Sequence, residues 1–371
     1  MKVLWITNIP SPYRVEFLKK LGEECQLDVV FECPFSKERD QSWRKTNTDG
    51  FKAIFLKGIQ YKTDMAFAPE IIKYLKKDYD VIVVTDYASL TGMLAIFYMR
   101  YHQIPFVLEG DGAYRGSGQG YKEKLKKKLI KSAKYCLATS EEHKLFYMFY
   151  GAKEDRIFKY PFTSIHEKEV LEMPPTKEQK IYLRQEKNIA EKYIILSVGQ
   201  FIYRKGYDVL LNAANKLDRN IGIYIIGGKP TEEYKRQVKQ YELVNVHFLD
   251  FMSSEELKSF YQLADLFVLP TREDIWGLVI NEALANGLPV ITTNGCIAGS
   301  ELITNECGKI VEKENVDQLA SSIEELLRST AWRKLAELTC LKKIKYYTIE
   351  NMCAVHMNIF NRILRGEGND I

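Results

Sequence analysis

Short apolar runs alternate along the chain with stretches of helical periodicity. The apolar runs fall at residues 2–7, 27–31, 81–84, 105–108, 135–139, 157–161, 193–198, 221–226, 245–249, 265–269 and 290–293. Continuous runs of this kind are typical of parallel strands that are buried on both faces. Apolar residues at helical spacing follow several of them, as at 15–21, 207–217 and 278–285. This alternation predicts an α/β fold with parallel sheets and crossover helices.

The length of the chain points to more than one domain. At 371 residues and 46% hydrophobic content, the chain can form two cores. Residues 166–191 are charged and contain Pro174 and Pro175, as expected of a linker followed by a short helix. We therefore predict one doubly wound domain over residues 1–165 and a second over 166–345.

The most informative stretch joins the strand at 265–269 to the helix at 278–285. Asn286 and Gly287 provide a C-terminal stop for this helix. The first turn of a helix leaves backbone N–H groups unpaired at the positive end of its dipole. Because Gly277 has no side chain, an anion can approach the amides of Gly277, Leu278 and Val279. The stretch therefore suits a phosphate.

Two acidic residues belong to the same stretch. Glu282 lies about one turn into the helix, where its carboxylate can accept hydrogen bonds from sugar hydroxyls. Asp274 lies ahead of the helix, where an acid favours the dipole and can reach a ligand. The alternative is an ordinary crossover with Asp274 as an N-cap and Glu282 as a solvated side chain.

This stretch resembles the signature of the GT4 glycosyltransferases, the retaining group 1 enzymes with the GT-B fold. Their pattern is an acid, seven residues and a Glu, followed by Ala and a Gly-x-Pro-Val turn. Asp274 and Glu282 have this spacing, with Ala283 and the turn at 287–290 behind them. The family usually has Glu at the first position, whereas this chain has Asp274, with Glu273 one place earlier.

The resemblance implies two Rossmann-like doubly wound domains that face each other across a cleft. It also implies that the final helix, expected at 349–364, returns to the first domain, so that residues 346–371 pack there. The second domain would bind the donor, a nucleotide-diphosphate sugar, and the first would face the acceptor. No metal ion or other cofactor is expected.

A second strand-loop-helix carries cations at 199–206. In GT4 enzymes this loop holds an Arg and, five places on, a Lys, which neutralise the donor diphosphate. Lys205 matches the Lys, while Gln200 stands where the Arg usually lies. Arg204 can supply the missing charge if the backbone turns it inward, and the alternative is a solvated Arg204.

Two further donor-side candidates follow later strands. Gly227, in a glycine pair after the strand at 221–226, allows a nucleotide to lie close to the backbone. Phe251 lies in the turn at 250–254, where the family's nucleotide base usually binds. The alternative for Phe251 is a core aromatic residue.

The first domain offers candidates for the acceptor side. Arg14 ends a proline-rich loop after the first strand, which is a usual ligand-facing position, although a surface helix residue is equally compatible. Glu109 and Asp111 open a glycine-rich loop at 109–120 that, by resemblance, faces the reacting sugar. Either acid could position or deprotonate an acceptor hydroxyl. The alternative is simple turn chemistry, and we expect no metal site from this pair.

Residues 121–134 predict a basic helix, and the polar stretch at 40–50 predicts an irregular loop near the acceptor. The helix carries lysines at 122, 124, 126, 127, 128, 131 and 134, with apolar residues between them. Such a helix can bind anionic lipid headgroups. The alternative is a solvated face on a helix that packs inward through its leucines.

Composition bears on the binding partners and the cellular location of the protein. The net charge of +4 gives no nucleic-acid signature. The seven cysteines are odd in number and scattered, which favours reduced thiols and no zinc site. No stretch is long and apolar enough to span a bilayer, and residues 2–7 predict a core strand and not a signal peptide. We expect a cytoplasmic protein, with peripheral attachment to the inner face of the membrane as an option.

The resemblance implies a retaining, metal-independent transfer of a sugar from a nucleotide-diphosphate sugar to a glycan or lipid-linked saccharide, in surface polysaccharide biosynthesis. Lys205, with Arg204 or Gln200 and the helix amides, would stabilise the leaving diphosphate. Glu282 would bind the ribose and Asp274 the donor sugar. Two alternatives remain: a GT-B sugar-nucleotide epimerase, and a non-catalytic nucleotide-sugar-binding protein, since Gln200 and Asp274 depart from the pattern.

Overall fold

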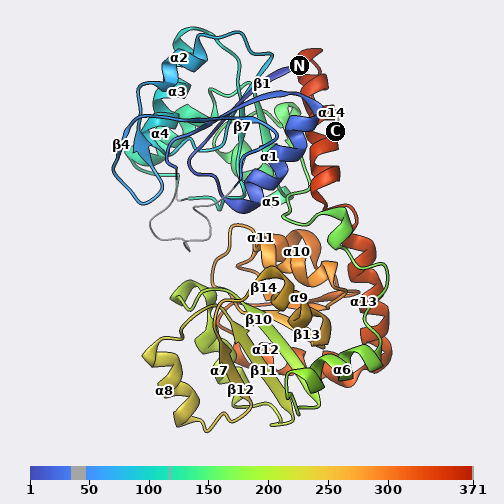
Figure 1. The fold of residues 1–371 in the computed structure, drawn as a ribbon. Coiled ribbons are helices and arrows are strands. Elements are labelled where there is room, and N and C mark those ends of the chain that lie inside the picture. The colour runs from blue at the N-terminus through green and yellow to red at the C-terminus, as the bar shows by residue number, and fades with distance from the viewer. Residues whose placement is uncertain (35–46, 117, 370–371) are drawn as a thin grey trace. The chain divides into compact units, whose positions relative to one another are not determined.

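The computed structural model describes residues 1–34, 47–116 and 118–369. The chain forms two compact units, Met1–Ser164 with Thr348–Ile371, and Ile165–Tyr347 (Figure 1). The sequence-based boundaries were 165/166 and 345/346. Most of the loop predicted at 40–50 lies outside the described residues.

Unit 1 is built on a seven-stranded sheet in the order β3-β2-β1-β6-β7-β8-β9, in which every pairing is parallel. The strands are β1 (Lys2–Thr7), β2 (Gln26–Phe31), β3 (Lys52–Phe55), β6 (Val81–Val84), β7 (Val107–Glu109), β8 (Tyr135–Ala138) and β9 (Ile157–Lys159), beside a hairpin of β4 (Ile59–Gln60) and β5 (Ala66–Phe67). The helices are α1 (Pro12–Glu24), α2 (Ile71–Leu75), α3 (Leu90–Tyr101), α4 (Tyr121–Ile130), α5 (Glu141–Phe149) and α14 (Ile349–Leu364).

Unit 2 is built on a six-stranded parallel sheet in the order β12-β11-β10-β13-β14-β15. Its strands are β10 (Tyr193–Val198), β11 (Ile221–Ile226), β12 (Val246–Leu249), β13 (Leu266–Leu269), β14 (Val290–Thr293) and β15 (Gly308–Val311). Its helices are α6 (Lys177–Glu186), α7 (Tyr207–Ala214), α8 (Glu232–Gln240), α9 (Ser254–Leu263), α10 (Leu278–Ala285), α11 (Ile297–Leu302), α12 (Val316–Arg328) and α13 (Thr330–Ile344).

The strand order locates a ligand-facing edge in each sheet. In unit 1 the order reverses between β1 and β6, and in unit 2 between β10 and β13. Ligands of doubly wound sheets bind outside the carboxyl ends of the strands at such a reversal. The continuous apolar runs of the sequence form these central strands, and β6 and β13 are buried along their whole length. The loops that follow β1 and β6 in unit 1, and β10 and β13 in unit 2, therefore lie at these ligand-facing edges, and the loop after β7 lies one strand further along.

The final helix belongs to unit 1. It packs against α1, as Figure 1 shows, and buries one face that includes Met352, Ile359 and Phe360. A segment made after the whole of unit 2 thus completes the core of unit 1.

Some elements differ from the sequence-based prediction. Helix α4 ends at Ile130, and α7 ends at Ala214 after a 3₁₀ turn at Tyr203–Lys205. Helices α8 and α9 were not predicted. Helix α8 buries only Tyr234, and Tyr234 and Val238 are its only apolar residues, so its sequence offers a short apolar signal. Helix α9 does have a readable start signal, a capping box between Ser253 and Glu256.

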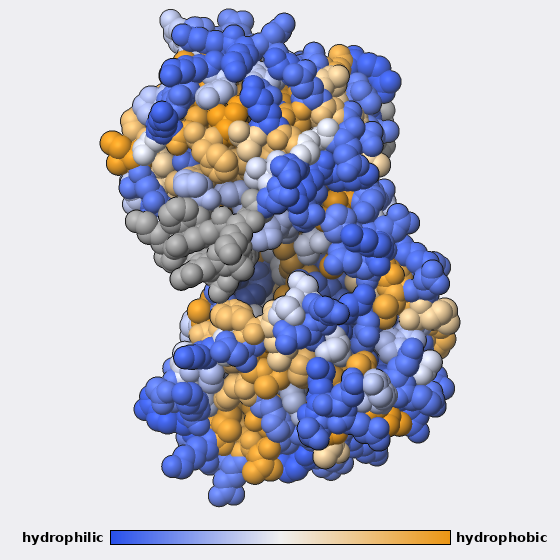
Figure 2. Space-filling view, viewed as in Figure 1, coloured by the Kyte–Doolittle hydropathy of each residue, from blue (hydrophilic) through white to orange (hydrophobic). Residues whose placement is uncertain are grey.

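The surface in the view of Figure 2 is largely hydrophilic, with apolar side chains gathered in patches on each unit. Among the described residues, no helix has the length and apolar character needed to cross a membrane.

We expect Gly206→Ala to destabilise unit 2 more than Gly287→Ala does. The two glycines have nearly the same φ, +69° and +67°, so the backbone strain of about 1 kcal/mol is shared. A Cβ at 206 would lie 2.1 Å from the Pro270 carbonyl oxygen, whereas one at 287 has 3.4 Å to its nearest neighbour. The clash should add about 1–3 kcal/mol to the loss in free energy of unfolding, measured in urea. Equal losses in the free energy of unfolding would show that the loop around Pro270 moves aside for the added methyl group without further cost.

Candidate functional site

A charge clamp formed by Lys205, Arg204 and Asp274 lies at the reversal point of unit 2. Lys205 Nζ is 2.5 Å from Asp274 Oδ2, and Arg204 Nη1 is 3.1 Å from Oδ1. Arg204 also donates to the Glu273 carbonyl at 2.8 Å. Asp274 is only 7% exposed. The N-cap of α10 is Gly277 and not Asp274, and Arg204 is paired with Asp274 and is therefore not a purely solvated residue.

The backbone fixes the clamp from two directions. Arg272 N and Thr271 Oγ1 both donate to the Arg204 carbonyl, which joins the loop after β13 to the 3₁₀ turn. On the other side, Asp274 N donates to Gly295 O at 2.7 Å, and Ile297 N donates to Asp274 O. The cations and the acid are thus held by loops from different strands.

Helix α10 begins beside the clamp. Gly277 is its N-cap at φ +101°, and a Cβ there would lie 2.9 Å from Cys296 Sγ. Leu278 and Val279 open the first turn and are half-buried. Gly277 is therefore required both by its backbone conformation and by its close approach to Cys296.

Glu282 lies one turn further along α10 and is oriented by a residue that the sequence analysis missed. Tyr261 of α9 donates its hydroxyl proton to Glu282 Oε2 at 2.7 Å. Burial raises the pKa of Glu282 above its ordinary value, and the bond from Tyr261 opposes that rise. No short motif links Tyr261 to Glu282; only the packing of α9 beside α10 does.

Three other donor-side candidates follow β10, β11 and β12. A Cβ on Gly227 would lie 1.8 Å from Gly199 O, so only glycine lets these two loops touch. The ring of Phe251 covers Gly228, yet Phe251 is 59% exposed, so the alternative of a core aromatic is wrong. Gln200 is exposed in the loop after β10.

In unit 1 the acceptor-side candidates also meet. Arg14 Nη1 lies 2.7 Å from Glu109 Oε1, and its other terminal nitrogen pairs with Asp111. Tyr13 donates to Asp111 Oδ2 at 2.6 Å. Arg14 is 6% exposed, so it is not a surface helix residue. The two acids are held by a network and not only by the turn chemistry of their loop.

Two more residues that the sequence analysis missed complete this network. Tyr160 donates towards Glu109 Oε1 and the Gly110 carbonyl, at 3.2 and 3.1 Å. His356, on α14, places Nε2 3.4 Å from Glu109 Oε2. Burial alone would raise the pKa of Glu109, but His356 and Arg14 outweigh burial and hold it below the ordinary value. Their separation along the chain hides these partners from any local pattern.

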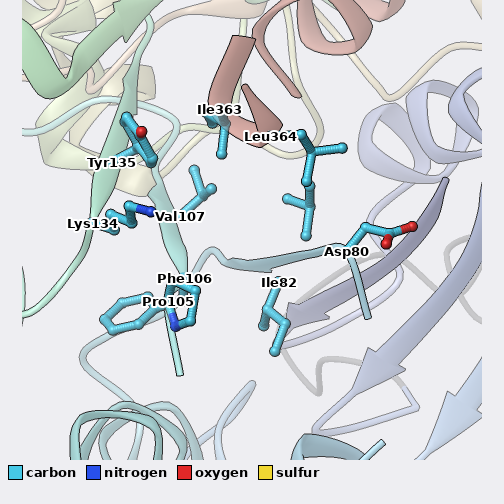
Figure 3. Close-up of a pocket in the computed structure, with 10 residues that line it drawn as sticks. Asp80, Ile82, Pro105, Phe106, Val107, Lys134, Tyr135, Ile363 and Leu364 are labelled. Atoms are coloured by element: carbon cyan, nitrogen blue, oxygen red, sulfur yellow. The ribbon is translucent and has the colours of Figure 1, made fainter. Parts of the chain in front are cut away.

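A cavity of about 150 Å³ lies elsewhere in unit 1 (Figure 3). Its lining includes Asp80, Pro105, Lys134 and Ile363. These residues lie near the amino ends of β6, β7 and β8 and the end of α14, whereas Glu109 and its loop follow the carboxyl end of β7. None of the candidate site residues lines this cavity, so it is separate from the site.

Comparison with known proteins places these features in a family. Residues 179–339 match the model of the glycosyl transferases group 1 family. The range contains all the donor-side candidates. A GDP-mannose-dependent alpha-(1-6)-phosphatidylinositol monomannoside mannosyltransferase of Mycobacterium tuberculosis is 31% identical over 157 residues. That match covers 39% of this chain and 41% of the length of the relative.

A longer match and a solved structure extend the comparison. The N,N'-diacetylbacillosaminyl-diphospho-undecaprenol alpha-1,3-N-acetylgalactosaminyltransferase of Campylobacter jejuni is 22% identical over 315 residues, 81% of each chain. The structure of HepE of Anabaena in complex with UDP superposes with a TM-score of 0.78 at 15% identity, covering 98% of this chain and 99% of that one. Residues 179–339 thus match the glycosyl transferases group 1 family, as the sequence-based resemblance implies, and the likeness to solved structures confirms the predicted GT-B fold.

We expect Lys205→Met to destabilise unit 2 by about 3 kcal/mol, because it removes the principal partner of a buried carboxylate. Arg204→Met should cost less than about 1 kcal/mol, because Arg204 is 44% exposed. The measurement is urea unfolding of the two variants beside the unmodified protein. Similar losses in both variants would contradict the ranking of the two cations.

Proposed function

We propose that the protein is a retaining glycosyltransferase. It moves a sugar from a nucleotide-diphosphate sugar to a saccharide or lipid-linked saccharide, in surface polysaccharide biosynthesis and without a metal ion. The observation that carries the proposal is the clamp of Lys205, Arg204 and Asp274 at the start of α10, within the range that matches the group 1 family.

The clamp has the charge that a diphosphate site needs. Two cations and one carboxylate leave one net positive charge beside the positive end of a helix dipole. In the proposed complex the diphosphate takes over part of the pairing that Asp274 provides in its absence. Lys205, Arg204 and the amides of Gly277 to Val279 then stabilise negative charge as the diphosphate leaves.

The sugar and nucleoside have their own partners in this proposal. Asp274, freed in part from the cations, binds hydroxyls of the donor sugar, and Glu282, oriented by Tyr261, binds those of the ribose. The exposed ring of Phe251 offers a face for the base, and Gln200 lines the same side. UDP is bound in HepE, and GDP-mannose is the donor of the mycobacterial relative, so both bases are worth testing.

On the acceptor side, burial separates the roles of the two acids. Glu109 is 1% exposed, whereas Asp111 is 23% exposed. Asp111 is therefore the carboxylate that can reach an acceptor hydroxyl and help position or deprotonate it. Arg14, which is itself paired with Glu109, binds Asp111 and holds its carboxylate in place. The curated relatives are transferases, which favours this function over an epimerase.

A thermal-shift screen of nucleoside diphosphates tests the donor site. We expect one diphosphate to raise the melting temperature, because a ligand at a hundredfold excess over its dissociation constant stabilises by about 2.7 kcal/mol. Lys205→Ala and Glu282→Ala should lose the shift. The control Lys235→Ala, on the exposed side of α8, should keep it. No shift with any diphosphate, from folded protein, would refute the donor site.

We also propose that helix α4 docks unit 1 on an anionic membrane surface. Six of its lysines and those just after it are exposed: Lys122, Lys124, Lys127, Lys128, Lys131 and Lys134. Lys126 instead pairs with Glu123, and Leu129 and Ile130 are buried in the core. Exposed aromatic side chains lie nearby, with Lys128 Nζ 5.4 Å from the ring of Phe97. The contact would therefore be made by charge and aromatic rings.

Vesicle co-sedimentation tests this docking. The protein should bind phosphatidylcholine vesicles that contain phosphatidylglycerol, and not those without it. A triple variant with Lys124, Lys127 and Lys128 changed to Gln should bind more than tenfold more weakly, since each lysine contributes about 1 kcal/mol. A matched triple change in unit 2, at Lys235 and Lys239 of α8 and at Lys216 just after α7, should leave binding intact. Equal binding by both triple variants would refute a role for α4.

A further inference from the structure

The imidazole of His356 is enclosed in the core of unit 1. Its side chain has no exposed surface, and the rings of Phe17, Tyr160 and Trp5 surround it at centroid distances of 4.7, 4.6 and 6.0 Å. Nδ1 lies 2.7 Å from the Met352 carbonyl oxygen. Nε2 lies 3.4 Å from Glu109 Oε2.

These contacts determine where the imidazole protons are. A carbonyl oxygen only accepts hydrogen bonds, so Nδ1 must carry a proton. A neutral ring would then turn the lone pair of Nε2 towards a carboxylate oxygen, and two acceptors would oppose each other. Among the described residues, neither Nε2 of His356 nor Oε2 of Glu109 has another hydrogen-bond partner. A proton on Nε2 satisfies both buried atoms at once.

The charge balance of the network leads to the same conclusion. Arg14 faces two carboxylates, Glu109 and Asp111. With a neutral His356 this buried group would carry one net negative charge, whereas an imidazolium makes it neutral. The other groups around the ring, Trp5, Phe17 and the phenol of Tyr160, bring no charge.

We propose that His356 is a doubly protonated positioning residue for the acceptor site. It binds Oε2 of Glu109. One terminal nitrogen of Arg14, together with the Tyr13 hydroxyl, then remains available to orient Asp111. Without this hydrogen-bond donor, Glu109 draws Arg14 away from Asp111, and the exposed carboxylate loses its orientation. The link to the acceptor rests on the proposed function, whereas the protonation rests on the geometry alone.

Nitrogen NMR of ¹⁵N-histidine-labelled protein tests the protonation directly. The chain has five histidines, and the signal missing from His356→Gln identifies His356. At neutral pH we expect both of its ring nitrogens to be protonated. Glu109→Gln should convert the ring to the neutral form. A neutral His356 in the unmodified protein would overturn the proposal.

His143 is the matched control for this measurement. It is also buried in unit 1, and a Cβ on Gly110 would lie 3.3 Å from its Nε2. Burial lowers the pKa of His143 to about 3, so its ring is neutral at the same pH. The spectrum should therefore contain one charged and one neutral buried ring, and His143→Gln should leave the His356 signal unchanged.

Kinetics test the positioning role. The assay uses the donor whose diphosphate is found in the thermal screen, with octyl glycosides as acceptors. His356→Leu should lower kcat roughly tenfold, because a displaced Asp111 no longer holds the acceptor, while KM for the donor stays the same. His356→Gln should recover most of kcat, since its amide can donate to Glu109.

The outcomes separate the two proposals. If kcat of His356→Leu stays within twofold, or Gln fails to restore it in a folded protein, His356 is not a positioning residue. If no donor is turned over, the proposed function fails, while the NMR result still decides the protonation of His356.

Discussion

A carboxylate buried at the carboxyl end of a parallel strand must meet a cation, and both units are organised around such a pair. In unit 2 the pair is Asp274 with Lys205, and in unit 1 it is Glu109 with Arg14. In each unit the cation follows the first strand of the sheet, β10 or β1, and the acid follows a later strand near the reversal point. An unpaired charge at either place would carry a desolvation penalty of several kcal/mol.

This requirement explains why the surrounding backbone is so constrained. The loops that carry charges can meet only where no side chain intervenes, as at Gly206, Gly227 and Gly277. Because loops from separate strands are bonded to one another around Asp274, the cations are held in place before any ligand arrives. A site prepared in this way needs little reorganisation when charge develops on a substrate.

Much of the fold was predictable because its signals are local. Buried strands leave continuous apolar runs, and α10 and α14 begin and end at the residues expected from the sequence. The donor-side candidates could be picked out from the sequence because they share short spacings with a known signature. Sequence analysis did not identify Tyr261, Tyr160 and His356 as site residues, because their partners lie far away along the chain. Helix α8 was not predicted because it buries a single side chain.

The return of α14 to unit 1 also orders events during synthesis on the ribosome. Arg14, Glu109 and Asp111 emerge early, but His356 and the apolar face that covers Phe17 follow only after unit 2 has been made. Until then the nascent first unit lacks the His356 partner of Glu109 and the helix that packs against α1. The charge network of unit 1 is therefore complete only after both units have been translated.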